Sequence, residues 1–334
     1  MKALVLAAGK GTRMRPVTDQ VSKPLLPLRG HPTLYYILED LINSGVTEIG
    51  IVVSDENVAQ IQEFINMSKF KLKKKIEVIV QKQQLGVAHA VKTARHFLDN
   101  QDFILYLGDN LFQSGVKQVI SSFLKKDNTT IAVKKIIDPS KFGVAVISPE
   151  GNLVKIIEKP DNPPSNYAVS GIYCFKKGIF ESIDKIKPSK RGEYEITDAI
   201  EDLLKNNINV NAEIIDGWWI DTGNLHDFLI ANRNIYKSNK DSKLNSKFSY
   251  KSTNSIVDDN CLIKNESNII NSSINNFSSV GDRVIIVNSN IDNCVLMDGC
   301  KIKNIDLKNC LVGPNSILES NFKDKKIVIN RIIL

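Results

Sequence analysis

Residues 2–16 of this chain, KALVLAAGKGTRMRP, decide how its fold begins. Lys2 to Ala8 form a short, continuous apolar run, which is typical of a strand buried on both faces. Gly9 and Gly11 interrupt this run and predict a glycine-rich turn at the carboxyl end of the strand. Basic residues follow the glycines at once, so both backbone N–H groups and guanidinium groups are available there to bind phosphate oxygens.

The loop differs from two other phosphate-binding loops. Met14 stands where a dinucleotide-binding G-x-G-x-x-G loop needs its third glycine. No glycine lies five residues before a Gly-Lys-Ser/Thr triplet, as a Walker A loop requires. The sequence therefore indicates an anion-binding turn of another kind.

After the loop, helical periodicity alternates with short apolar runs. This alternation predicts an α/β fold with a Rossmann-like, mostly parallel sheet, whose ligands bind at the carboxyl ends of the strands. Both the glycine loop and Asp109 follow such ends. The expected helices are 34–44 and 87–98, and the expected further strands are 49–53, 76–80 and 103–107.

The sequence changes in character near residue 238. From there on asparagine becomes about twice as frequent, histidine is absent, and aliphatic residues recur six positions apart. This pattern resembles the hexapeptide repeat of left-handed parallel β-helices, with asparagine at corners that need a positive φ; a β-rich tail of another kind is the alternative. We therefore predict two domains, residues 1–237 and 238–334. The aliphatic residues expected to point inward are Ile256, Leu262, Ile263, Ile269, Ile274, Val280, Ile286, Leu296, Ile302, Ile305, Leu311 and Ile317.

Composition narrows the classes of partner. The net charge of +7 is compatible with nucleic acid, an anionic membrane surface or small anionic substrates. No apolar run is long enough to span a membrane, and the N-terminal run is too short for a signal peptide. The five cysteines contain no CxxC pair and the four histidines have no metal-ligand spacing, so we expect free thiols in the cytoplasm. The lysine-rich cluster at 69–75 is interpreted as solvated surface, with a polyanion-binding patch as the alternative.

Nine motifs in a fixed order resemble sugar-1-phosphate nucleotidylyltransferases, most closely the long-form glucose-1-phosphate thymidylyltransferases, which end in a β-helix. The resemblance covers nearly all of residues 1–235 and, more loosely, the rest. It departs from the family at Ser22, where proline is common. The motifs are LAAGKGTRMRP (6–16), SKPLLPL (22–28), Gln81 with LGVAHAV (85–91), LGDN (107–110), FGVA (142–145), EKP (158–160), AVSGIY (168–173), RGEYEITD (191–198) and WWIDTG (218–223).

The resemblance implies transfer of a nucleotide from dTTP to glucose-1-phosphate, which gives dTDP-glucose and pyrophosphate. Arg13, Lys23 and Asp109 would be the catalytic residues, and Asp109 and Asp221 would hold Mg²⁺. The nucleotide would be bound by Leu6, Ala8, Gly9, Gly11, Thr12, Arg13, Gln81, Gly86 and Asp109. The sugar phosphate would be bound by Asn110, Gly143, Glu158, Lys159, Val169, Gly171 and Glu193. Trp218 and Trp219 are interpreted as packing residues, and the histidines as surface or packing residues.

Other functions remain open at this point. UTP in place of dTTP, or another sugar-1-phosphate, is the main alternative, since one methyl group separates the two bases. A non-catalytic regulatory homologue is disfavoured because the cationic loop and the acids are all present. An acetyltransferase activity of the β-helix is disfavoured because residues 238–334 contain no histidine. We expect small-molecule substrates, no nucleic acid, no membrane, and a homo-oligomer assembled or regulated through the β-helix.

Overall fold

The computed structural model describes residues 1–70, 75–238, 248–320, 327–329 and 331–333. The chain divides into two compact units. The first unit comprises Met1–Gly9 and Tyr36–Trp219, and the second comprises Lys10–Tyr35 and Ile220–Leu334. The domain boundary after residue 237 stays a prediction, and residues 71–74 of the basic cluster lie outside the described residues.

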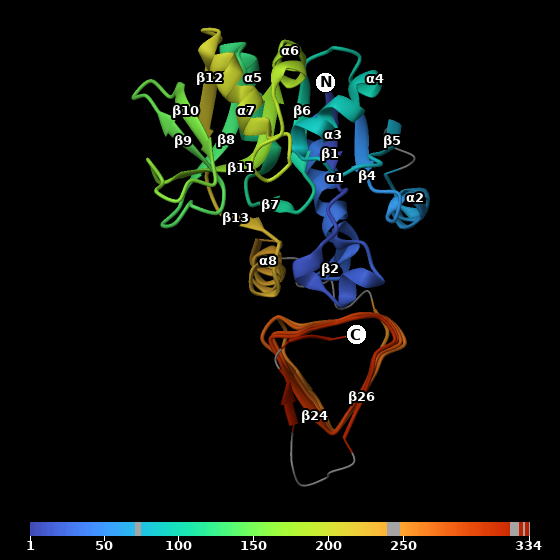
Figure 1. Cartoon of the computed structure of the whole chain (residues 1–334). Coiled ribbons are helices and arrows are strands. Elements are labelled where there is room, and N and C mark those ends of the chain that lie inside the picture. Colours follow the sequence, from blue (N-terminus) through green and yellow to red (C-terminus); the bar gives the residue numbers. More distant parts are fainter. Residues whose placement is uncertain (71–74, 239–247, 321–326, 330, 334) are drawn as a thin grey trace. The chain divides into compact units, whose positions relative to one another are not determined.

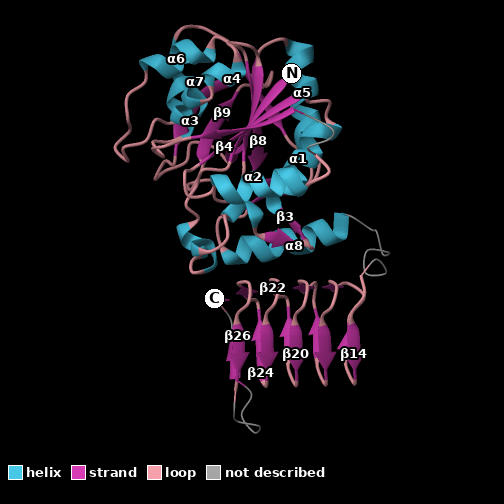
Figure 2. Ribbon diagram, turned by 90° about the vertical axis from the view of Figure 1, so that its right-hand side faces the viewer, coloured by secondary structure: helices cyan, strands magenta, loops and turns pink. Residues whose placement is uncertain are grey.

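The first unit is built on a nine-stranded sheet with helices on both faces (Figure 2). Its helices are α1 (Thr33–Asn43, which begins in the second unit), α2 (Val58–Met67), α3 (Val87–Thr93), α4 (Arg95–Leu98), α5 (Gly115–Lys126), α6 (Ile179–Lys185) and α7 (Ile196–Lys205). Its strands are β1 (Lys2–Leu6), β4 (Glu48–Val53), β5 (Lys75–Val80), β6 (Phe103–Leu107), β7 (Asn110–Phe112), β8 (Thr129–Lys135), β9 (Gly143–Ile147), β10 (Leu153–Glu158), β11 (Tyr167–Phe175) and β12 (Val210–Ile214).

The parallel half of this sheet confirms the α/β prediction. Strands β6, β1, β4 and β5 are neighbours and all pair in parallel. The apolar runs of β1, β4 and β6 are almost wholly buried, as expected for strands covered by helices on both sides, whereas the edge strand β5 is only partly buried. Leu6 pairs with Leu107 at the last residue of each strand, so the two predicted ligand loops leave the sheet at the same level.

The other half of the sheet centres on β11 and is mostly antiparallel, although β12 pairs with β8 in parallel. Strand β11 pairs antiparallel with β6, β8 and β9, and β10 extends the sheet beyond β9. The register between β11 and β8 shifts between Val169 and Tyr173, and Gly171 within this irregularity has a φ of 85°. A bulge of this kind redirects the strand locally, and glycine adopts the required φ without strain.

One predicted helix is divided in two. The expected helix 87–98 appears as α3 and α4, which meet at Ala94. The N–H of this fully buried residue is shared between the carbonyl groups of Ala90 and Val91, at 3.2 Å each, which tightens the last turn of α3. His89 and His96 therefore lie on different helices.

The second unit begins with the glycine loop and ends with the β-helix. Its first segment contains three short 3₁₀ turns, Thr12–Met14, Val17–Asp19 and Lys23–Leu25, and the strand pair β2 (Pro27–Leu28) and β3 (His31–Pro32). Strand β13 (Trp219–Asp221) leads into this unit, and helix α8 (Leu225–Ser238) follows it.

The C-terminal part forms three five-stranded parallel sheets, one for each side of a left-handed β-helix, as predicted. Figure 1 shows the triangular outline of its coils, and Figure 2 shows the strands of successive coils side by side. The first sheet contains β14 (Lys251–Thr253), β17 (Asn268–Ile270), β20 (Ile285–Val287), β23 (Lys301–Lys303) and β26 (Ile317–Glu319). The second contains β15 (Ile256–Val257), β18 (Ser273–Asn275), β21 (Asn290–Asp292), β24 (Ile305–Lys308) and β27 (Ile327–Ile329). The third contains β16 (Leu262–Ile263), β19 (Ser279–Val280), β22 (Val295–Leu296), β25 (Leu311–Val312) and β28 (Ile332–Ile333).

The length of a coil differs from three hexapeptides. In the first sheet Asn268 pairs with Ile285, 17 residues on, whereas Ile285 pairs with Lys301, 16 residues on. A strict six-residue spacing therefore loses phase with the coil. Ile256 and Ile317 were expected inside and are 70% and 63% exposed. The expected aliphatic residues that do join the buried cluster are Ile263, Ile269, Ile274, Val280, Ile286, Leu296, Ile302 and Ile305.

Asparagines occupy the corners of the β-helix, as predicted. The side chains of Asn271, Asn288 and Asn304 form a ladder, in which each amide nitrogen donates to the next amide oxygen at 3.2 and 3.0 Å. Each ladder residue therefore adopts the left-handed conformation and also bonds its neighbour in the adjacent coil. The corner asparagines with positive φ are Asn254, Asn271, Asn276, Asn288, Asn293, Asn304, Asn309 and Asn315.

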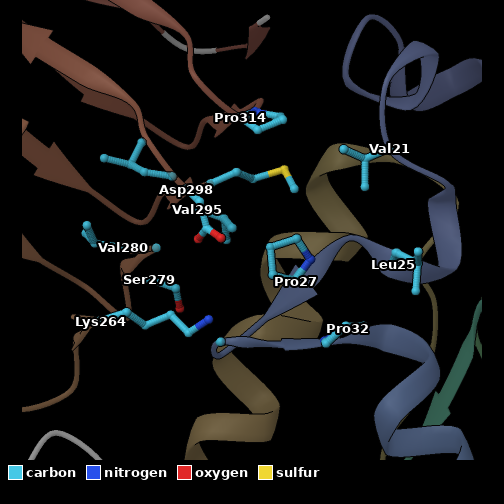
Figure 3. Close-up of a pocket in the computed structure, with 14 residues that line it drawn as sticks. Val21, Leu25, Pro27, Pro32, Lys264, Ser279, Val280, Val295, Asp298 and Pro314 are labelled. Carbon is cyan, nitrogen blue, oxygen red and sulfur yellow. The ribbon is translucent and has the colours of Figure 1, made fainter. Parts of the chain in front are cut away.

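Within the second unit, the segment that follows the glycine loop packs on the β-helix. The Asn232 side chain of α8 accepts from the Arg29 N–H at 2.7 Å and donates to the Phe277 carbonyl at 2.8 Å. A β-carbon on Gly30 would lie 2.7 Å from Leu262, so Leu262 is buried against this segment. A cavity of about 240 Å³ remains between the segment and strands β19 and β22 (Figure 3), and it contains none of the candidate site residues.

No helix among the described residues is both long enough and apolar enough to cross a membrane.

Candidate active site

The first cluster of predicted residues lies where β1 and β6 end. The Gly108 N–H donates to the Leu6 carbonyl at 2.8 Å, and a β-carbon on Gly108 would lie only 2.4 Å from that oxygen. Glycine at this position therefore permits the close approach of the two loops. The approach brings Asp109 to the same edge of the sheet as Leu6 and Ala8.

Asn110 is held by hydrogen bonds on both sides. Its amide nitrogen donates to Asp109 Oδ1 at 2.8 Å, and its amide oxygen accepts from the indole N–H of Trp219 at 2.6 Å. The Trp219 ring also packs on Phe142, with centroids 4.9 Å apart. The interpretation of Trp219 as a packing residue was therefore incomplete, because the same ring also orients a predicted sugar-binding amide. A β-carbon on Gly171 would lie 3.1 Å from the Asn110 side chain, which places the β11 bulge against it.

The predicted sugar-phosphate residues converge around Glu158. A β-carbon on Gly143 would lie 3.4 Å from Glu158 Oε2 and 3.5 Å from Val169, so these three residues share one wall. Lys159 Nζ lies 3.6 Å from Glu158 Oε1, and the Lys159 side chain is 45% exposed. Glu158 and Lys159 therefore place an acceptor for hydroxyl groups beside an accessible cation for a phosphate.

Sequence reasoning missed the residues that support Glu158. The Thr197 hydroxyl donates to Glu158 Oε2 at 3.2 Å, and the Arg191 guanidinium lies 4.0 Å from Glu158 Oε1. The same guanidinium contacts Glu193 at 2.8 Å and the buried Glu195 at 3.0 Å. Burial raises the pKa of the Glu195 carboxyl above its ordinary value. The motif at 191–198 contained all of these residues and was the available signal.

Of the predicted nucleobase residues, Gln81 directly follows β5 and Gly86 directly precedes α3. Gly86 has a φ of 105°, and a β-carbon there would lie 2.6 Å from the Tyr194 carbonyl. The buried Gln81 side chain contacts His89 on α3, with 2.8 Å between Gln81 Nε2 and His89 Nδ1. His89 is therefore a partner of a predicted site residue, so the interpretation of the histidines as surface or packing residues is incomplete for His89.

The second unit contains the predicted cations Arg13 and Lys23. Gly11 has a φ of 63°, and its carbonyl accepts from the Thr18 hydroxyl at 2.8 Å. A β-carbon on Gly11 would lie 3.1 Å from the Lys23 β-carbon, so the loop packs directly on the stem of this lysine. Gly9 and Thr12 are exposed, which leaves their backbone accessible to a ligand.

Arg13 and Asp221 are brought together over Gly223. A β-carbon on Gly223 would lie 2.5 Å from Arg13 Nη2 and 3.0 Å from Asp221 Oδ1. The guanidinium and the carboxylate therefore share the space that the missing side chain leaves. Sequence reasoning had assigned roles to Arg13 and Asp221 and had not predicted that Gly223 makes room for both.

The candidate metal ligands are divided between the two units, with Asp109 in the first and Asp221 in the second. Among the residues that the structure describes, no group of three or more His, Cys, Asp and Glu side chains is placed to hold a metal ion. Each of these side chains is a carboxylate, an oxygen donor of the kind that hard divalent cations prefer.

The profile of the nucleotidyl transferase family matches residues 2–238. The chain belongs to the nucleotidyl transferase family. Members of this family generally use a divalent metal ion, and the chemistry of the two carboxylates fits that requirement.

Two curated relatives are each 40% identical to this chain. One is the low-salt glycan biosynthesis nucleotidyltransferase Agl11 of Haloferax volcanii, matched over 235 residues that cover 70% of this chain and 65% of the relative. The other is the glucose-1-phosphate thymidylyltransferase of Streptomyces antibioticus, matched over 237 residues that cover 70% of this chain and 66% of the relative. The match thus spans about two thirds of the length of each relative.

A solved structure, that of a UDP-glucose pyrophosphorylase complexed with UDP-glucose, is similar to this chain with a TM-score of 0.65 and 28% identity. The similarity covers 71% of this chain and 98% of that one.

Proposed function

We propose that this chain transfers a thymidylyl group from dTTP to glucose-1-phosphate and releases pyrophosphate. The observation that carries the proposal is the 40% identity to the Streptomyces antibioticus glucose-1-phosphate thymidylyltransferase over 237 residues. The pairing of Glu158 with Lys159 supports the sugar-phosphate half of the reaction, because it places an acceptor 3.6 Å from an accessible lysine.

In the proposed reaction a phosphate oxygen of glucose-1-phosphate attacks the α-phosphorus of dTTP. A new P–O bond forms as the bond to the leaving pyrophosphate breaks. Because the attacking oxygen is already anionic, the protein needs to supply no nucleophile and no strong base. Catalysis then consists of positioning the two substrates and stabilising their combined negative charge.

We assign the phosphate-binding roles to the glycine loop and the cations near it. The backbone of Gly9, Gly11 and Thr12 binds the triphosphate, Arg13 stabilises the leaving pyrophosphate, and Lys23 holds the α-phosphate. Leu6 and Ala8 border the nucleoside at the end of β1. When Mg²⁺ is bound, it neutralises phosphate charge, and Asp109 and Asp221 are the residues that would hold it.

We assign the sugar-phosphate roles to the first unit. Lys159 binds the phosphate, Glu158 accepts from sugar hydroxyl groups, and Gly143, Val169, Gly171 and Asn110 shape the pocket. Glu193 contributes through its ion pair with Arg191, at 2.8 Å. Gln81 and Gly86 bind the edge of the nucleobase.

Uridylyl transfer is the second candidate, because the chain is also similar to the structure of a UDP-glucose pyrophosphorylase complexed with UDP-glucose. The test is to measure pyrophosphate release with dTTP and with UTP, each paired with several sugar-1-phosphates in the presence of Mg²⁺. We expect the highest kcat/KM with dTTP and glucose-1-phosphate. A clear preference for UTP would reassign the activity, and failure with every pair would refute it.

We further propose a cytoplasmic homo-oligomer in which the β-helix serves assembly. The assembly is supported by the β-helix, in which five parallel strands in each sheet form a regular face. The cytoplasmic location is supported by the five cysteines of the chain, which are all free and buried. Light scattering of the full chain tests the assembly, and we expect a mass of at least twice 37.3 kDa. A monomeric mass across the working concentration range would contradict it.

A further inference from the structure

His89 contacts Gln81, the residue proposed to bind the nucleobase, and this contact fixes the orientation of the Gln81 side-chain amide. The distance between Gln81 Nε2 and His89 Nδ1 is 2.8 Å. An amide nitrogen can only donate, so this contact requires Nδ1 of His89 to be unprotonated and to accept. With Nε2 held in this way, the amide oxygen Oε1 lies in the same amide plane on the opposite side of the Cγ–Cδ bond, and so faces away from His89.

The surroundings of His89 favour the neutral ring. Partial burial and the charge of Lys92, one turn along α3, lower the pKa of His89 below its ordinary value. Lys92 is itself paired with Asp184 of α6 at 2.9 Å, and the Tyr194 ring stacks beside His89 with centroids 6.3 Å apart. These side chains line an open pocket of about 410 Å³, and the His89 side chain is only partly buried.

The amide oxygen of Gln81 keeps its capacity to accept a hydrogen bond. Within the described residues, the side chain of Gln81 makes its hydrogen bond to His89. Uracil and thymine carry a donor, N3–H, on the edge that a carbonyl oxygen would meet. Cytosine carries an unprotonated N3 at the same position, so the same oxygen would face a lone pair.

We propose that His89 is a specificity-determining positioning residue: by accepting from Gln81 Nε2, it presents Gln81 Oε1 to the nucleobase and selects imide-bearing pyrimidines over cytosine. The inference rests on the proposed function, which places Gln81 at the nucleobase. It goes beyond that function in naming the group that sets the orientation of the amide. His89 touches neither substrate nor reacting atoms, and acts through Gln81.

Three variants test the proposal. His89→Leu removes the acceptor, so the Gln81 amide can turn and discrimination should fall. His89→Asn places an amide oxygen near the position of Nδ1, which accepts without titrating, so discrimination should be retained. His96→Leu is the matched control, because His96 is an exposed histidine on α4 whose ring faces Glu77 at 3.3 Å.

The measured quantity is the ratio of kcat/KM for dTTP to that for CTP, and the same ratio for UTP. We expect His89→Leu to lower both ratios on the order of 10- to 100-fold, the usual effect of a mismatched buried hydrogen bond. His96→Leu and His89→Asn should keep both ratios within about threefold of the values for the unchanged chain, since substitutions outside a specific interaction usually have small effects. An unchanged ratio in His89→Leu overturns the inference.

The pH profile separates positioning from a merely structural role. In the unchanged chain both ratios should fall as His89 becomes protonated at acidic pH, because a protonated Nδ1 cannot accept. Lys92→Met removes a charge that disfavours protonation, so the fall should begin at a higher pH. His89→Asn should abolish the pH dependence. A profile shared by the unchanged chain and His89→Asn overturns the inference.

Direct binding distinguishes failure of this inference from failure of the proposed function. Calorimetry compares the Kd of dTTP, UTP and CTP for the full chain and for His89→Leu, with no turnover needed. If the chain binds no nucleotide, the proposed function fails and the inference fails with it. If dTTP and UTP bind with an equal advantage over CTP in both proteins, only the inference fails.

Discussion

Replacing Gly223 by alanine tests how Arg13 is placed. The new β-carbon would lie 2.5 Å from Arg13 Nη2, whereas carbon and nitrogen atoms in contact need about 3.5 Å. The guanidinium must therefore move by about 1 Å, the difference between these two distances. A displacement of this size in a group that stabilises the leaving pyrophosphate is expected to lower kcat about 100-fold.

The cost in stability should be small by comparison. The atom nearest to the new methyl group is the far end of a flexible side chain, which can withdraw without disturbing the core. The variant is therefore expected to lose activity while its Tm falls by no more than a few degrees. Steady-state kcat under saturating dTTP and glucose-1-phosphate, together with calorimetric Tm, measures the two effects. Gly178→Ala is the matched control, because a β-carbon at Gly178 meets nothing within 4 Å.

Two outcomes would refute this reasoning. A kcat equal to that of the unchanged chain would show that the position of Arg13 over Gly223 is irrelevant to turnover. A loss that is equally large in an Arg13→Ala background would show that Gly223 acts through something other than Arg13, since effects transmitted through one residue do not add.

Three further predictions concern Asp40, Asn288 and Lys159. Burial raises the pKa of the Asp40 carboxyl from 3.8 to about 6. The folded state therefore binds the carboxyl proton more tightly than the unfolded chain does. Because of this difference, the free energy of unfolding falls as the pH rises from about 4 through 6 and Asp40 ionises. Asp40→Asn should therefore raise the free energy of unfolding at pH 7.5 by about 1–3 kcal/mol and leave it unchanged at pH 3.5, as measured by urea titration; equal effects at both pH values would contradict this. Asn288→Ala removes the hydrogen bonds to Asn271 and Asn304 and places alanine at a φ of 49°, so it should lower the free energy of unfolding by about 1–2 kcal/mol. Asn288→Gly removes the same bonds without the backbone strain, so it should lower the free energy of unfolding by less. Lys159→Ala should raise the KM for glucose-1-phosphate about 10-fold or more with a smaller effect on the KM for dTTP, because it removes a cation proposed to bind only the sugar phosphate; equal changes in both would argue against this role.

Much of the first unit could be predicted from local sequence. The strands β1, β4 and β6 are continuous apolar runs, and such runs are buried wherever a parallel sheet forms. The glycine loop was predictable for a similar reason, since its glycines and cations are adjacent in the chain. The asparagine-rich corners of the β-helix also follow from a property of single residues, the tolerance of asparagine for positive φ.

The remaining features depend on contacts between distant residues. Trp219 and Asn110 are 109 residues apart, so no periodicity could pair them. Gln81 and His89 are near in sequence, but they meet only because Gly86 turns the chain into α3. The coil length of 17 and then 16 residues could not be counted from six-residue spacings, because the corners differ in length, and this is why Ile256 and Ile317 were wrongly placed inside.

The second unit is built from two separate stretches of the chain, and this affects the design of chimeras between this chain and its relatives. Residues 10–35 and 220–334 form one compact unit, and Asn232, Gly30 and Leu262 join its segments. A chimera joined at residue 237 would take the glycine loop and the segment after it from one protein and the β-helix from the other. The segment would then have to pack on a β-helix with a different surface. Crossovers after Gly9, Tyr35 and Trp219 would instead exchange the loop and the coils as one inherited module. The most productive exchange is therefore discontinuous in sequence.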